Sequence, residues 1–131
     1  PQVEYDDATI AIMKFGENVA GKVFFFFGCK SDYTMRTVVY GTKGTIICDN
    51  TSPSITLFVT DEEGVTQDTK IIPVEVNNHN AAKEFEVFAD AILNDKPVIT
   101  DAREGAKTVA VCLAIVESAK TGKVVKPNYK F

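Results

Sequence analysis

The sequence has few residues of the kinds that build metal sites and disulfide frameworks. It contains one histidine, His79, and three cysteines, Cys29, Cys48 and Cys112, with no short Cys-x-x-Cys spacing. An odd number of widely spaced cysteines does not indicate a disulfide framework, and no group of His, Cys, Asp and Glu has a recognisable ligand spacing. We therefore expect reduced thiols and no bound metal.

Clustered positive charge is also missing. The 14 Lys and Arg residues form no run, and the 18 Asp and Glu residues outnumber them, leaving a net charge of -4. Because binding to nucleic-acid phosphates depends on clustered Lys and Arg, this balance argues against a nucleic-acid partner.

No apolar run is long enough to cross a bilayer. The longest one covers residues 23–27, whereas a membrane-spanning helix needs about 20 apolar residues. The chain does not open with the charged, apolar and small-residue succession of a signal peptide. We expect a soluble, cytoplasmic protein without a membrane partner, and 131 residues fit one domain over residues 1–131.

The first part of the chain favours antiparallel strands. Short β-prone segments alternate with turns rich in Gly, Asn and Asp, a pattern typical of hairpins. The expected strands are residues 9–15, 19–29, 34–40, 45–49, 54–60 and a looser one within 65–76. Between the third and fourth, Gly41 and Gly44 are both expected to supply the positive backbone angles of a tight turn.

The last part favours two helices. In the first, apolar residues recur at helical spacing over Phe85, Phe88, Ala89, Ile92 and Leu93. The second begins at Asp101, carries Glu104 in a capping-box position and ends at Gly122. We expect an α+β domain in which two C-terminal helices cover one face of an open, mostly antiparallel sheet of about six strands.

Four consecutive aromatic residues mark the second strand. Because strand side chains alternate between faces, Phe24, Phe25, Phe26 and Phe27 offer large apolar groups to both faces of the sheet. With helices on one face, the other face needs a cover, and we expect a contact with another subunit or domain. The alternative is that the run lies at the sheet centre beneath a loop.

No motif for binding a dinucleotide or phosphate is found. The sequence has no strand, GxGxxG turn and helix in succession, and residues 41–44 have neither the Walker spacing nor a following helix. We expect no catalytic or cofactor-binding residue within these 131 residues.

Four segments in order resemble a known family. They read VVYGTKGTI at 38–46, FADAILNDKP at 88–97, TDAREGA at 100–106 and VESAKTGK at 116–123. Together they resemble the C-terminal domain of the glucose-fructose oxidoreductase, inositol dehydrogenase and rhizopine-catabolism (Gfo/Idh/MocA) family. The resemblance implies an enzyme that uses NAD or NADP to oxidise or reduce a sugar, inositol or related polyol, and a homodimer or tetramer formed through the sheet. It also implies an absent N-terminal nucleotide domain, which carries the catalytic lysine of a Glu-Lys-Pro stretch, so the chain is expected to be inert alone.

The resemblance also implies residues of a substrate site. Lys30 and Tyr33 lie in a segment where inositol dehydrogenases place aromatics at the sugar site, although Ser31 replaces one of these aromatics. His79 precedes the first helix in a region that the family points toward its pocket. Alternatively, Tyr33 is an ordinary residue at the start of a strand, and His79 caps the helix or faces solvent. A second hypothesis is a non-catalytic oligomerisation or binding module that uses the same sheet.

Overall fold

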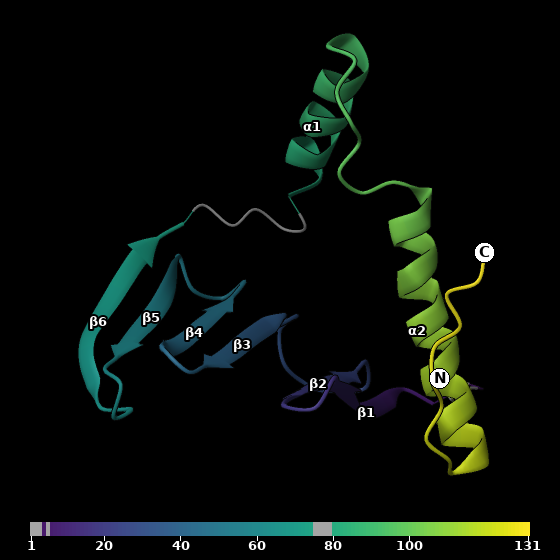
Figure 1. Cartoon of the computed structure of the whole chain (residues 1–131), viewed down its shortest axis with the longest axis horizontal. Coiled ribbons are helices and arrows are strands. Elements are labelled where there is room, and N and C mark those ends of the chain that lie inside the picture. The colour runs from purple at the N-terminus through teal and green to yellow at the C-terminus, as the bar shows by residue number, and fades with distance from the viewer. Residues whose placement is uncertain (1–3, 5, 75–79) are drawn as a thin grey trace. The chain divides into compact units, whose positions relative to one another are not determined.

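The computed structural model describes residues 4, 6–74 and 80–131, and over these the α+β prediction is confirmed. Six strands precede two helices (Figure 1). The strands are β1 (Ala8–Phe15), β2 (Val19–Phe26), β3 (Arg36–Gly41), β4 (Gly44–Asp49), β5 (Ser54–Thr60) and β6 (Thr66–Pro73), and the helices are α1 (Ala81–Leu93) and α2 (Ala102–Thr121).

The chain divides into two compact units. Unit 1 consists of Pro1–Cys29 and Asp95–Phe131, which contain β1, β2 and α2. Unit 2 consists of Lys30–Asn94, which contain β3 to β6 and α1. The strands pair as one antiparallel sheet of two strands and another of four, where the sequence predicted a single sheet. The two helices fall in different units, α2 with the two-stranded sheet and α1 with the four-stranded sheet.

In unit 1, β1 and β2 form the predicted hairpin. Their register runs from Ala8 opposite Phe26 to Phe15 opposite Val19, and Gly16 supplies a φ of 61° in the turn. Since residues directly opposite each other share a face, Phe24 lies on the same face as its partner Ile10.

The two faces of this hairpin differ in exposure along β1, whereas nearly all of β2 is exposed on both faces. Along β1, residues at odd positions from Thr9 to Met13 are half-buried, whereas the even positions between them are exposed. The exposed face contains large apolar side chains, which we call the hairpin outer face: Ile10, Ile12, Phe24 and Phe26, exposed by 64, 82, 62 and 43%. Phe25 and Phe27 form an aromatic pair, with ring centroids 5.3 Å apart. The four phenylalanines therefore do not form a single surface.

In unit 2, the sheet has the order β3-β4-β5-β6 (Figure 1). All seven residues of β5 are half-buried between β4 and β6. The turn between β3 and β4 joins Gly41 to its register partner Gly44. Only Gly44 has a positive φ, 152°, so the prediction that Gly41 also supplies one was wrong. Gly41 ends β3 within the ladder, where an ordinary strand conformation suffices.

The helix ends follow the sequence closely. The Asp101 carboxylate accepts hydrogen bonds from the backbone N–H groups of Arg103 and Glu104, at 2.9 and 3.0 Å. The Glu104 carboxylate contacts Lys107 instead of completing a reciprocal capping box. α2 ends at Gly122 in the left-handed conformation, with φ at 65°.

The described residues bury very little. Their only buried apolar side chains are Ala91 of α1 and Ala114 of α2. The predicted apolar stripe of α1 is exposed, with Phe85 at 74% and Ile92 at 65%. Exposed large apolar side chains therefore occur in both units.

Candidate functional site

The segment before β3 carries two of the predicted site residues. Lys30 and Tyr33 both lie in unit 2 between β2 and β3, outside the strands, and both are exposed. The Tyr33 side chain is 58% exposed, and its hydroxyl lies 3.9 Å from the sulfur of Met35. A thioether is a weak acceptor, so a substrate hydroxyl could replace this contact.

Asn50, at the end of β4, holds this segment in place. Its side-chain Nδ2 donates a hydrogen bond of 2.9 Å to the Tyr33 carbonyl oxygen, and its Oδ1 accepts one of 2.6 Å from the Met35 backbone N–H. The Asn50 backbone N–H also donates to the Met35 carbonyl oxygen at 3.3 Å. Three hydrogen bonds therefore connect one residue to the stretch that carries Tyr33.

Asp49, next to Asn50, is the centre of a polar cluster. Its carboxylate accepts hydrogen bonds from the Thr51 hydroxyl at 2.6 Å and the Thr51 backbone N–H at 3.0 Å. Arg36, its cross-strand partner, approaches to 2.9 Å through Nη2. The Asp49 side chain is only 7% exposed. The Thr51 hydrogen bonds, with a smaller contribution from Arg36, lower the pKa of the Asp49 carboxyl.

Because its pKa is lowered in the folded state, the Asp49 carboxyl is expected to stabilise the fold near neutral pH and to lose this contribution in acid. A carboxyl with a lower pKa in the folded state stabilises the fold above its unfolded pKa, near 3.8, and loses that contribution as pH falls through the folded value. We expect Asp49→Asn to lower the urea midpoint of unfolding at about pH 6, and the difference from wild type to shrink progressively as pH falls below the unfolded pKa. In a Thr51→Val background, which lacks the hydroxyl donor to Asp49, Asp49→Asn should lower the urea midpoint by less than it does in wild type. An Asp49→Asn effect that is constant across this pH range would contradict the prediction.

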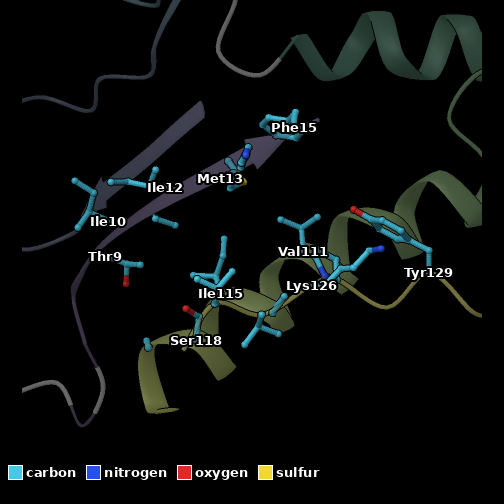
Figure 2. A pocket seen from close by; sticks show the side chains of 17 residues that line it. Thr9, Ile10, Ile12, Met13, Phe15, Val111, Ile115, Ser118, Lys126 and Tyr129 are labelled. Atoms are coloured by element: carbon cyan, nitrogen blue, oxygen red, sulfur yellow. The ribbon is translucent and has the colours of Figure 1, made fainter. Parts of the chain in front are cut away.

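A second candidate is an apolar hollow within unit 1. β1 lines one side, and α2 with the C-terminal segment lines the other, enclosing about 630 Å³ (Figure 2). The apolar lining includes Met13, Val111 and Ile115, and the polar lining includes Lys126 and Tyr129. The lining contains no Asp, Glu, His or Cys, so it offers no acid-base pair or nucleophilic thiol.

The predicted residues are distributed over both units. Lys30 and Tyr33 lie in unit 2, whereas Phe24 to Phe27 lie in unit 1. His79 lies outside the described residues. Sequence reasoning missed Asn50. A strand that ends in Asp-Asn-Thr-Ser-Pro is a signal for side-chain hydrogen bonding to nearby backbone, although it does not identify the partner.

The described part of the chain holds neither a metal site nor a membrane-spanning helix. No group of three or more His, Cys, Asp or Glu within 6–74 and 80–131 is placed to hold a metal ion. None of the helices described combines the length and the apolar character needed to span a bilayer.

Comparison with known proteins places most of the chain in a family. The model of the family described as "Oxidoreductase family, C-terminal alpha/beta domain" (GFO_IDH_MocA_C) matches residues 1–126. No curated protein and no solved structure shows a significant match.

Proposed function

Because the chain belongs to the Gfo/Idh/MocA oxidoreductase family, as its C-terminal α/β domain, we propose that it supplies the substrate-side wall and the subunit contact of an NAD(P)-dependent oxidoreductase. The proposed substrate is a sugar, an inositol or a related polyol. The observation that carries the proposal is the Tyr33 segment, where an exposed phenol stands on backbone fixed by three hydrogen bonds to Asn50.

The chemistry of a polyol suits this segment. A phenol ring stacks on the C–H face of a sugar, and its hydroxyl both donates and accepts hydrogen bonds. Lys30, in the same exposed segment, adds a cationic donor for substrate hydroxyls. These groups bind and orient the substrate, and orientation relative to a hydride acceptor contributes to the rate. We propose His79 as a further donor from the region before α1.

The nicotinamide cofactor does not fit the described part of this chain. Dinucleotides bind where a parallel strand leads through a glycine-rich turn into a helix. Every strand pair described here is antiparallel, and the glycine turn at Gly44 leads into β4. In the proposed enzyme, a dinucleotide-binding domain therefore binds the cofactor and supplies the proton-transfer groups. The two domains work together in the cytoplasm.

The hairpin outer face supports the second half of the proposal. Ile10, Ile12, Phe24 and Phe26 expose large apolar side chains on one face of two paired strands, where Lys22 is the register partner of Ile12. An apolar surface of this kind is typical of a protein interface, and we propose that it contacts a second copy of the chain in a homodimer or tetramer.

The test is a kinetic comparison of the protein made from its complete coding sequence. A panel of sugars, inositols and linear polyols is assayed with NAD and with NADP for wild type and Tyr33→Ala. We expect oxidation of at least one polyol, and Tyr33→Ala should raise its KM about tenfold while kcat changes by less than about twofold.

Tyr40→Ala is the matched control, since Tyr40 is 82% exposed on β3 and has no proposed contact with substrate. Unchanged KM in Tyr33→Ala would exclude Tyr33 from the substrate site. A protein that associates but oxidises no member of the panel would support the non-catalytic module instead.

A further inference from the structure

We infer that Asn50 is a positioning residue of the substrate site, whose carboxamide fixes the backbone of residues 33–35 and so presents the Tyr33 phenol to the polyol. The inference rests on the proposed function, because it assumes that Tyr33 contacts substrate. The observation that carries it is the pair of hydrogen bonds from one side chain to the backbone on both sides of residue 34.

The chemistry of these two bonds determines the orientation of the Asn50 amide. The Tyr33 carbonyl oxygen can only accept, and the Met35 backbone N–H can only donate. A carboxamide satisfies both groups in one orientation, with Nδ2 toward Tyr33 at 2.9 Å and Oδ1 toward Met35 at 2.6 Å. Aspartate would keep the acceptor and lose the donor, and leucine would lose both while keeping a similar volume.

The position of Asn50 explains why the conformation of residues 33–35 depends on its side chain. The β3–β4 ladder starts with Arg36 opposite Asp49, so the residues before Arg36 have no ladder partner to hold them. Asn50 follows Asp49 directly, and its side chain and backbone extend the pairing by three hydrogen bonds into the connecting segment. Without these bonds, a connecting segment of this kind samples several conformations, and a substrate would have to order it on binding.

Asn50 is itself well anchored. It is half-buried and lies between Asp49, which pairs with Arg36, and Thr51, which donates twice to the Asp49 carboxylate. The side chain that holds residues 33–35 is therefore itself connected to the four-stranded sheet. Because Asn50 is held by the sheet, it can keep the backbone at Tyr33 in one conformation.

The experiment combines a local readout at Tyr33 with a double-mutant cycle. The protein from the complete coding sequence is labelled with 3-fluorotyrosine, and the Tyr33 ¹⁹F resonance is identified by its loss in Tyr33→Phe. In Asn50→Leu, we expect this resonance to move toward the random-coil position, while that of Tyr40 stays in place. Asn50→Asp should show an intermediate change, and Asn94→Leu, which removes an amide bonded to Asp90 in α1, should show none.

The cycle tests whether Asn50 acts through Tyr33. Using the best polyol of the panel, we expect Asn50→Leu and Tyr33→Ala each to raise KM about tenfold, and the double variant to match Tyr33→Ala alone, because coupled residues are not additive. Additive increases in KM would overturn the inference, since a purely structural role predicts them.

The two possible failures can be told apart. An unchanged Tyr33 resonance in Asn50→Leu would overturn the positioning role whatever happens to KM. A displaced resonance with unchanged KM in both single variants would confirm that Asn50 holds Tyr33 and would overturn the proposed contact between Tyr33 and substrate.

Discussion

Replacing Gly44 by alanine is expected to unfold the four-stranded sheet of unit 2. A Cβ built on Gly44 would lie 2.1 Å from the backbone oxygen of Phe58 and 3.2 Å from its carbonyl carbon. Phe58 belongs to β5, which is paired on both sides, so its backbone cannot move away without breaking the pairing with β4 or β6. The φ of 152° at Gly44 adds strain for any residue with a side chain.

The expected loss is large compared with the stability of a domain. A backbone clash of this depth belongs with the rare substitutions that cost more than about 4 kcal/mol, whereas domains are stable by about 5–15 kcal/mol. Urea unfolding followed by circular dichroism measures the effect. We expect Gly44→Ala to be mostly unfolded without denaturant, or to unfold at a much lower urea concentration than wild type.

Two other glycines provide matched controls. Gly64 has a φ of 80°, but a Cβ added there would have no atom within 4 Å, so Gly64→Ala measures backbone strain without a clash. Gly105 lies within α2 with open space around it, and Gly105→Ala should raise stability by about 0.5–1 kcal/mol. If Gly44→Ala cost no more than Gly64→Ala, the close approach of β4 to β5 would not be a constraint on this fold.

Introducing lysine on the hairpin outer face is expected to abolish association between copies of the chain. Ile12→Lys and Phe24→Lys each replace a large apolar side chain of this face by an ammonium, and the register partner of Ile12 is already a lysine, Lys22. Burying an unpaired ammonium costs several kcal/mol, so each variant should weaken association by about 100-fold or more. Solution mass, measured by light scattering over micromolar to millimolar concentrations, should fall to that of a monomer.

The control makes the same change of charge elsewhere. Val65 is 54% exposed in the turn between β5 and β6, and Val65→Lys should leave the mass of the assembly unchanged. A wild-type chain that is monomeric over the whole concentration range would refute the proposed subunit contact. Phe25 and Phe27 are predicted to matter less for association, because they pair with each other away from the outer face.

The strands and helices were predictable because each has a local signal. Hairpin turns bracket the strands, helical spacing identifies α1, and Asp101 and Gly122 mark the two ends of α2 where the structure has them. These features depend on residues close in sequence or joined by a single hairpin, and physical rules apply there directly.

The Asn50 contacts could not be predicted in the same way. Asn50 is 17 residues from Tyr33, and their contact depends on the exact register in which β3 pairs with β4. A shift of one residue would turn the same side chain to the other face. The distinction between Gly41 and Gly44 also depends on register, since only Gly44 approaches the backbone of β5 closely. The family resemblance therefore indicated Tyr33 as a candidate site residue but not the residue that holds its backbone.

The scarcity of buried side chains also bears on how this domain unfolds. Many large apolar side chains of the described residues are exposed, so a partner that covers them would add to the apolar surface buried in the folded state. The heat capacity change and the denaturant m-value of unfolding both scale with that surface, so both should rise when copies associate. A partner that covers the apolar faces binds the folded state alone and shifts the equilibrium by mass action. The stability of this domain is then a property of its concentration and its neighbours as much as of its own sequence.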